Sequence, residues 1–451
     1  MIKNVISVID GETGSCGKAK VIGEIATDAS ITLGASITNC MPNAGHTFVD
    51  ETGKSIVFRN IPVAAVNPTT ELFIGPGSAI DMKVFKEEYS CAEKYLKNRK
   101  IYVHEMVPLI EERHKEYEKE HIKSGSTFKG CGAVSQEKIM RSQNLHFFKT
   151  FKNAIVCSNY EWLERLYSHL DNPYEYVMLE GSQGCDLDLN HSGNYPYTTS
   201  RNVSTSQLLA DCGISSERLL QTIMVIRPFP IRISNVTKSG EVIYTGGYGS
   251  GEELTWSQIN LASMLKQYPY RNDVDCYCSC INTKKIKKLI KHCPEIYLKQ
   301  LFGENYRSKS FHTITLLQAL ELERLYYKSK GLCKYKTNLI DLPIDCNIVD
   351  MSEQTTVTKM ERRIFDLDIN KLKMNCRINT PSSLYLNFFQ HLDFDLMNEK
   401  GDAKNYHFNR YIREYLNWLE SETGVQVAAL GTGAKNGEKI LIKKMIMDIQ
   451  K

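Results

Sequence analysis

The sequence has no long apolar run, and neither sign of charge is in large excess. No uninterrupted apolar stretch approaches the roughly 20 residues that cross a bilayer, and residues 1–4 lead into a strand-like run without a signal-peptide pattern. We therefore expect a cytoplasmic protein, in the host cytoplasm if the source is viral, with no membrane partner. The 56 basic residues nearly balance the 52 acidic ones and are scattered, which argues against nucleic acid as a partner and favours small charged ligands.

A disulfide framework is also missing. The 14 cysteines are spread irregularly over 451 residues, as expected for reduced thiols that are buried or inert. Cys276, Cys278 and Cys280 form one cluster, but they alternate as in a strand and contain no C-x-x-C pair. Zinc binding there stays an alternative, although known zinc sites use other ligand spacings.

The sequence does contain short β-branched runs that alternate with helical patterns. Residues 4–9 are typical of a buried parallel strand, and residues 18–26, after a glycine-rich turn, are typical of a helix. Further strand-like runs lie at residues 56–59, 71–74, 101–103, 154–157, 176–180, 222–227 and 425–429. This alternation predicts an α/β fold with a largely parallel central β-sheet flanked by helices. Ligands of such sheets bind at the carboxyl ends of the strands.

Residues 257–350 differ from the rest in being rich in lysine and tyrosine, with helical patterns at residues 283–292 and 313–327. We interpret them as an inserted, mostly helical subdomain of unknown role. Residues 1–256 and 351–451 would then form one catalytic core.

The glycine-rich turn resembles a phosphate-binding loop but departs from the Walker A pattern. Gly11 and Gly17 are separated by five residues rather than four, and Ala19 follows Lys18 where a hydroxyl would bind magnesium. A glycine-rich loop with a lysine between a strand and a helix still favours phosphate. Taken alone, the segment leaves an ordinary turn as the less favoured alternative.

Four further segments occur with this loop in a fixed order. They are residues 43–47 (NAGHT), 126–132 (STFKGCG), 180–184 with 195–200 (EGSQG, YPYTTS), and 355–359 with 362–363 (TTVTK, RR). In this order they resemble adenylosuccinate synthetase, the ligase that joins aspartate to the 6-position of a purine nucleotide. The resemblance covers residues 1–256 and 351–451, and it implies Mg²⁺ as cofactor and a homodimer with shared active sites.

One residue of the loop departs from the family. The family sequence G-D-E-G-K-G-K lies over residues 14–20, and its catalytic, magnesium-binding aspartate falls on Ser15. Serine stands there in a subfamily, the 2-aminoadenylosuccinate synthetases of phages and archaea, which use GMP or dGMP. Residues 226–232, 253–256 and 355–359 also resemble that subfamily. A short hydroxyl leaves room beside the 2-amino group of guanine and can both donate and accept a hydrogen bond.

The resemblance assigns the remaining site residues by position. It implies catalytic roles for Ser15, Lys18, His46 and Gln183, with His46 on a loop as an acid that titrates near neutrality, and metal contacts from Ser15 and the Gly45 carbonyl. It implies contacts to the substrate nucleotide from Asn43, Thr127, Gln183, Thr199 and, across the dimer, Arg141. It implies binding of L-aspartate by Thr355, Thr356, Thr358, Lys359 and Arg362. ATP would contact Gly14, Gly17, Lys18, Arg363, Asn387, Gln390, Gly431, Thr432 and Gly433. The sequence does not decide which of Arg362 and Arg363 faces aspartate and which faces ATP.

The donor base is inferred from Gln390. The family has an aspartate there, which accepts hydrogen bonds from two donors of guanine, whereas an amide gives one bond and accepts one, as adenine requires. The sequence therefore predicts an ATP-dependent ligase of aspartate and GMP or dGMP. Two alternatives stay open: an ordinary IMP-using adenylosuccinate synthetase, and a purine-nucleotide-binding regulator that has lost catalysis.

Overall fold

The computed structural model of the chain describes residues 1–122, 127–235, 244–265, 289, 291–292, 298, 316–332, 334–335, 348–355 and 360–450. Its centre is an eleven-stranded sheet in the order β16-β18-β17-β15-β9-β1-β8-β2-β5-β6-β7. The pairs are parallel except β17 with β18. The predicted α/β fold with a largely parallel central sheet is confirmed. The strands are β1 (Val5–Asp10), β2 (Leu33–Thr38), β5 (Glu71–Ile74), β6 (Ile101–His104), β7 (Ala154–Cys157), β8 (Tyr176–Glu180), β9 (Leu219–Ile226), β15 (Ser383–Leu386), β16 (Gly401–Asp402), β17 (Val427–Gly431) and β18 (Lys439–Leu441).

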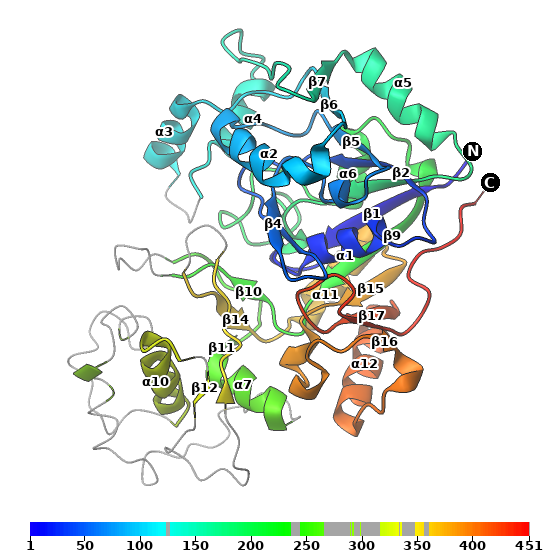
Figure 1. The fold of residues 1–451 in the computed structure, drawn as a ribbon. Helices are drawn as coiled ribbons and strands as arrows, with labels where there is room; N and C mark the ends of the chain where they lie inside the picture. Colours follow the sequence, from blue (N-terminus) through cyan, green and yellow to red (C-terminus); the bar gives the residue numbers. More distant parts are fainter. Residues whose placement is uncertain are drawn as a thin grey trace.

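Helices cover both faces of this sheet (Figure 1). They are α1 (Lys18–Ala26), α2 (Met82–Leu96), α3 (Glu112–His121), α4 (Cys131–Ile139), α5 (Asn159–Leu170), α6 (Thr205–Asp211), α11 (Ile369–Asn379) and α12 (Arg410–Thr423). The side chains of β1 alternate between two apolar clusters: Ile9 packs in the cluster of Trp162, and Ile6 in that of Ile22. Such burial stabilises the fold by about 1.5–3 kcal/mol for each large apolar side chain.

Four strands of the sheet are absent from the sequence prediction, namely the short β16 and β18 at one edge and the buried β2 and β15. β2, with the sequence LGASIT, lies between β8 and β5, and β15, with SLYL, lies between β9 and β17. Both are fully buried, but small and hydroxyl side chains interrupt the apolar pattern that indicates a strand. The predicted strand at residues 56–59 forms as β4 (Ser55–Phe58) outside the central sheet, where it pairs with β3 (His46–Val49).

The remaining elements are small. β10 (Ile231–Arg232), β14 (Arg363–Phe365) and β11 (Glu253–Leu254) form a second sheet, and β12 (Lys334–Tyr335) pairs with β13 (Ile348–Val349). In the predicted insert, helices α7 (Trp256–Leu265) and α10 (Leu316–Ser329) lie beside this second sheet (Figure 1). The short 3-10 turns are η1 (Val63–Val66), η2 (Cys185–Leu187), η3 (Ser216–Arg218), η6 (Phe389–His391), η7 (Phe394–Leu396) and η8 (Ala403–Asn405). Among the described residues, no helix is both long and apolar enough to cross a bilayer.

The topology brings the predicted segments to one edge of the central sheet. The glycine-rich loop follows β1, residues 39–45 follow β2, and residues 181–184 follow β8, while Asn387 and Thr432 follow β15 and β17. Because these strands are parallel, all five segments leave the sheet at its carboxyl edge, where ligands of α/β proteins bind.

Candidate active site

A buried carboxylate at the end of β1 holds the glycine-rich loop in shape. Asp10 accepts hydrogen bonds from the backbone N–H groups of Glu12 and Gly14, both at 3.1 Å, and of Cys16 at 2.9 Å. Gly14 and Gly17 have φ angles of 89° and 88°, in the region that favours glycine. The loop is thus fixed ahead of the amino end of α1, an arrangement suited to binding phosphate. Asp10 is the last residue of β1, one position beyond the predicted strand, and the sequence alone did not mark it as a site residue.

Lys18 begins α1 and is buried against the same loop. Its Nζ lies 3.3 Å from the Asp10 carboxylate and donates to the carbonyl of Gln183 at 2.9 Å. Gln183 has a φ of 61°, and a Cβ at the neighbouring Gly184 would overlap the carbonyl of Glu12. The loop after β8 therefore packs directly on the loop after β1, and Lys18 contacts both.

Ser15 lies exposed on the glycine-rich loop, with a φ of 59°. Its hydroxyl oxygen accepts a hydrogen bond of 2.8 Å from Nη1 of Arg362. The structure therefore brings the predicted catalytic serine together with an arginine that the sequence predicts to bind aspartate, although the two lie far apart in the chain.

Arg362 belongs to two paired segments, residues 353–355 and 360–362, which we call the hairpin legs. The N–H of Thr355 donates to the carbonyl of Met360, and the N–H of Arg362 to that of Glu353, both at 2.8 Å. Arg362 and Thr355 of the predicted aspartate site thus lie on one small unit. The other predicted aspartate ligands, Thr356, Thr358 and Lys359, lie outside the described residues.

Arg227 is a site residue that the sequence prediction missed. It follows β9, is fully buried, and pairs with Glu353 of the hairpin legs through Nη1 at 3.2 Å and through Nη2. Its guanidinium lies 4.0 Å from the centre of the Phe388 ring. Arg227 occurs in the Ile-Arg-Pro segment after β9, but its role depends on Glu353 and Phe388, which are far away in sequence.

His46 is the first residue of β3 rather than part of a loop, and it is buried. Burial and the charges of Lys18 and Arg59 lower the pKa of His46 from 6.5 to about 3, so the expectation that it titrates near neutrality is wrong for the free protein. The Cys40 Sγ lies 3.9 Å from Nδ1, and burial raises the pKa of that thiol to about 11. A thiol that keeps its proton can donate to Nδ1, which leaves the proton of the neutral ring on Nε2.

The lowered pKa of His46 gives a prediction about stability. The unfolded chain binds a proton at His46 below pH 6.5, whereas the folded chain does so only near pH 3, so this residue destabilises the fold as pH falls between those values. We compare the free energy of unfolding of wild type with that of His46→Asn. The wild-type value minus the variant value should fall by about 2 kcal/mol when the pH is lowered from about 7.5 to about 5. Urea unfolding of both proteins at both pH values measures the difference, in which the other titrating groups cancel. An equal change in the two proteins would contradict it.

The segment after β15 approaches the glycine-rich loop. Asn387 donates to the carbonyl of Cys16 at 3.0 Å, and a Cβ at Gly17 or Gly431 would overlap the Asn387 amide. Gln390 lies in η6, and its buried Oε1 has no hydrogen-bond partner among the described residues. Its backbone carbonyl accepts a bond of 2.6 Å from Ser263 of α7. A buried amide oxygen without a partner fits a group that receives a hydrogen bond from a ligand.

Two other residues that the sequence predicts to contact ATP form hydrogen bonds with other protein groups. Arg363 bonds to Glu253, with Nε at 2.9 Å from Oε1, and to the carbonyl of Gly246 at 2.6 Å. The Thr432 hydroxyl donates to the carbonyl of Glu399 at 2.6 Å. Arg362, and not Arg363, therefore reaches the glycine-rich loop.

The predicted nucleotide contacts lie on three segments around this edge. The backbone of Asn43 is beside the Cys131 thiol at the start of α4. Thr127 is exposed, and Thr199 donates its N–H to the carbonyl of Leu187 at 2.7 Å. Arg141 is exposed after α4 with a φ of 55°. No described contact joins these side chains to the glycine-rich loop.

Comparison with known proteins identifies the group to which this chain belongs. The adenylosuccinate synthetase family profile matches residues 8–175 and 145–247, which together are more than half of the sequence. The chain belongs to the adenylosuccinate synthetase family. It is thus a member of a group of ligases that join aspartate to a purine nucleotide, as the sequence predicted.

Relatives of this family member carry two different names. It is 31% identical over 249 residues to the N6-succino-2-amino-2'-deoxyadenylate synthase of Cyanophage S-2L, covering 53% of this chain and 67% of that one. It is 31% identical over 230 residues to the adenylosuccinate synthetase of Methanococcus aeolicus, covering 50% and 66%. The structure of the Cyanophage S-2L succinoaminodeoxyadenylate synthetase bound to dGMP and dATP has the same fold, with a TM-score of 0.66 at 22% identity over 98% of this chain and 96% of that one.

The metal contacts that the sequence predicts for this synthetase-family site are of the chemical type that Mg²⁺ prefers. The Ser15 hydroxyl and the Gly45 carbonyl are oxygen donors, and Mg²⁺ takes most of its other ligands from water and substrate phosphates. In the part of the chain that the structure describes, no group of three or more His, Cys, Asp or Glu side chains could hold a metal ion. A metal ion that binds together with the nucleotide phosphates does not require such a group of protein ligands.

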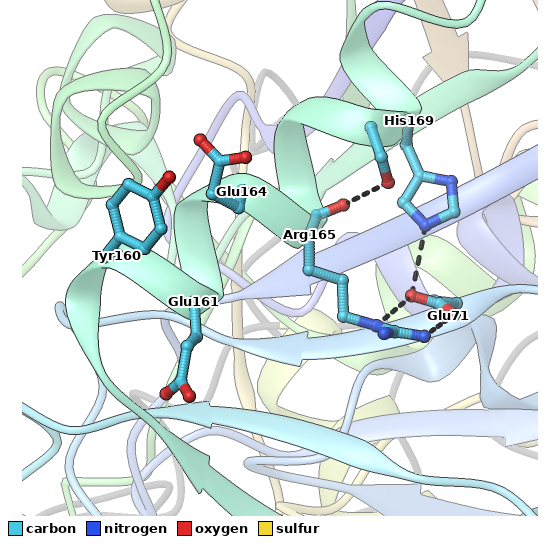
Figure 2. Close-up of a pocket in the computed structure, with 7 residues that line it drawn as sticks. Glu71, Tyr160, Glu161, Glu164, Arg165 and His169 are labelled. Atoms are coloured by element: carbon cyan, nitrogen blue, oxygen red, sulfur yellow. Dashed lines mark hydrogen bonds and ion pairs between the residues drawn. The ribbon is translucent and has the colours of Figure 1, made fainter.

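A separate depression lies along α5, away from the carboxyl edge of the sheet (Figure 2). Its volume is about 580 Å³. Arg165 bonds to Glu71 through Nε at 2.8 Å, and His169 contacts the same carboxylate at 3.1 Å. Glu71 begins β5 and so lies at the amino edge of the sheet. Among the lining residues, the side chains of Arg165 and His169 bond to that of Glu71, and the depression contains none of the predicted site residues.

Proposed function

We propose that the protein joins L-aspartate to the 6-position of GMP or dGMP with hydrolysis of ATP. The products would be 2-aminoadenylosuccinate or its deoxy form, ADP and phosphate. The observation on which this rests is Ser15, whose hydroxyl, held by Arg362 at 2.8 Å, occupies the family's aspartate position. Similarity to the Cyanophage S-2L synthase supports the proposal.

The hydrogen bond from Arg362 defines what Ser15 can offer a base. A hydroxyl has one hydrogen and two lone pairs, and Arg362 occupies one lone pair. Ser15 can still donate to the 6-oxygen, and its second lone pair can either accept from an N–H group at the Watson–Crick edge of guanine or contact Mg²⁺. A carboxylate in its place would pair with Arg362 and add bulk beside the 2-amino group.

The chain's own groups suit a 6-phosphoryl intermediate. Lys18 and the loop amides stabilise charge on the phosphoryl group as its bond to ADP breaks and its bond to the 6-oxygen forms. The N1 proton leaves to solvent through the exposed Ser15 hydroxyl, and the neutral His46 ring donates a hydrogen bond to the 6-oxygen. Arg362 and Thr355 orient the carboxylates of aspartate, whose amine then displaces phosphate. When bound, Mg²⁺, held by Ser15 and Gly45, would neutralise phosphate charge.

An assay of the purified protein tests the proposal. Aspartate, Mg²⁺ and every pairing of GMP, dGMP, IMP or dIMP with ATP or GTP are supplied, and nucleoside diphosphate release is measured. Turnover of GMP or dGMP with ATP supports the proposal. Turnover of IMP with GTP and none of dGMP with ATP would show an ordinary adenylosuccinate synthetase. Thermal stabilisation by nucleotides without any turnover would indicate a regulator.

Gln390 supports ATP as donor. Its Oε1 is buried without a partner in the described parts of the chain, and it can accept from the adenine 6-amino group while the amide N–H donates to N1. The carboxylate of Gln390→Asp cannot donate, so we expect kcat/KM for ATP to fall by about tenfold or more and that for GTP to rise. KM for aspartate serves as the internal control. Unchanged ATP kinetics would contradict this assignment of Gln390.

A homodimer belongs to the same proposal. Ile139 and Met140, at the end of α4, are 78% and 72% exposed, and Arg141 follows them. Exposed apolar side chains beside an arginine are typical of a protein interface. Sedimentation of the purified protein measures the oligomeric state.

A further inference from the structure

Arg324 of α10 is fully buried and surrounded by carboxylates. Its guanidinium bonds to Glu321 at 3.1 Å, to Asp350 at 3.1 Å, and to Glu361 at 2.6 Å. Lys328, one turn further along α10, bonds to Glu361 and, at 2.6 Å, to the Ser352 hydroxyl. Although burial opposes ionisation, the charges of Arg324 and Lys328 lower the pKa of Glu361. These groups therefore form one charged network in the protein interior.

This network joins α10 to both hairpin legs. Asp350 and Ser352 lie immediately before the first leg, and Glu361 belongs to the second, opposite Gln354. Arg324 and Lys328 therefore hold the two legs together from the side of the insert. Arg227 holds Glu353 from the side of the central sheet.

Glu361 and Arg362 are neighbours that contact opposite sides of the legs. Glu361 bonds to Arg324 and Lys328, whereas Arg362 bonds to Ser15. Successive side chains of an extended segment point to opposite faces. A shift of Glu361 would therefore move Arg362 relative to Ser15 and the phosphate-binding loop.

We propose that α10 of the insert positions the hairpin legs and thereby sets the affinity for L-aspartate, with Arg324 and Lys328 as positioning residues. The inference rests on the proposed function, because Arg362 and Thr355 are there assigned to aspartate. It gives the insert a role at the site although no residue of α10 is assigned to a substrate. The residues assigned to GMP or dGMP and to ATP lie mainly on the loops after β1, β2, β8 and β15, to which Arg324 and Lys328 form none of the bonds described above.

Steady-state kinetics of Lys328→Met tests the proposal. We expect KM for L-aspartate to rise by about fivefold or more, since coupled elements typically change affinity by that amount. KM for the purine nucleotide and for ATP should rise less than KM for aspartate, because Arg324 and Lys328 bond to none of the residues assigned to these two ligands. Arg324→Met should raise KM for aspartate further, and Arg324→Lys should recover part of the loss.

Lys373→Met provides the matched control. Lys373 is a partly buried helical lysine that bonds to Glu422 at 2.7 Å, away from the hairpin legs. We expect its KM for aspartate to match wild type. Lys328 is partly exposed, with 19% of its side chain accessible, so its variant keeps the test valid if Arg324→Met does not fold. Equal changes in all three KM values, or lower thermal stability with unchanged KM for aspartate, would overturn the proposal.

Hydrogen–deuterium exchange separates failure of this proposal from failure of the proposed function. The N–H groups of Thr355 and Arg362 are bonded across the legs. If α10 positions the legs, both amides should exchange faster in Lys328→Met than in wild type and Lys373→Met. Exchange as in wild type overturns the positioning role whether or not the protein turns over aspartate. Absence of any aspartate-dependent turnover by wild type contradicts the proposed function instead.

Discussion

Lys18→Met is expected to lower kcat by about 10²–10³-fold while the protein stays folded, because one fixed donor to a developing charge is typically worth that much. Lys18 is buried, and its Nζ lies between the Asp10 carboxylate and the carbonyl of Gln183. Two loops of the site therefore hold this charge in place before substrate binds. Methionine has a similar length but cannot neutralise phosphoryl oxygens. Rapid-quench measurement of ADP formation would show whether the first chemical step is the one that slows.

Lys20→Met is a closely matched control for this experiment. Lys20 lies in the same helix, is buried to the same degree, and bonds to Glu24 and, at 3.1 Å, to Tyr385. Its removal leaves Glu24 short of a partner in the core, so stability should fall, while kcat stays near that of wild type. Equal losses of kcat in both variants would mean that Lys18 acts through folding alone, and would contradict its catalytic assignment.

The sequence predicts the fold class because its buried strands are strongly apolar. β1 and β9 carry the β-branched runs of central parallel strands and form where the pattern indicates. The sequence pattern does not predict β2 and β15, because glycine, serine and tyrosine lie at buried positions of these strands. Those positions are buried by contacts with residues far away in the sequence. Ser36, for example, bonds to the buried Glu180 at 2.8 Å, a contact that no local pattern reveals.

The site was predictable where short segments follow strands, and unpredictable where two distant segments meet. The sequence motifs predicted that the loops after β1 and β8 belong to the site, and in the structure Lys18 contacts both loops. The contact between Ser15 and Arg362 joins residues 347 positions apart, so sequence could not decide between Arg362 and Arg363. The neutrality of His46 likewise results from burial and from Lys18 and Arg59, which are brought close only by folding.

Ser15→Asp is expected to reverse the choice of substrate nucleotide. The new carboxylate would lie beside the Arg362 guanidinium, which now bonds to the serine hydroxyl at 2.8 Å, and the pair would keep it ionised. An ionised carboxylate can accept the N1 proton of IMP, while its bulk crowds the 2-amino group of guanine. We expect the ratio of kcat/KM for dGMP to that for IMP to fall by about 10²-fold or more.

Ser15→Asn separates the two parts of that argument. Asparagine has the shape of aspartate without its charge, and both residues tolerate the left-handed backbone that the φ of 59° requires. If size alone excludes guanine, both variants should lose dGMP turnover. Ser15→Asp should gain the larger IMP turnover, because an ionised carboxylate is a stronger base for the N1 proton than a neutral amide. If Ser15→Asp keeps the wild-type preference, Ser15 does not determine the choice of substrate nucleotide. The presence of serine at this position then no longer supports the proposed function.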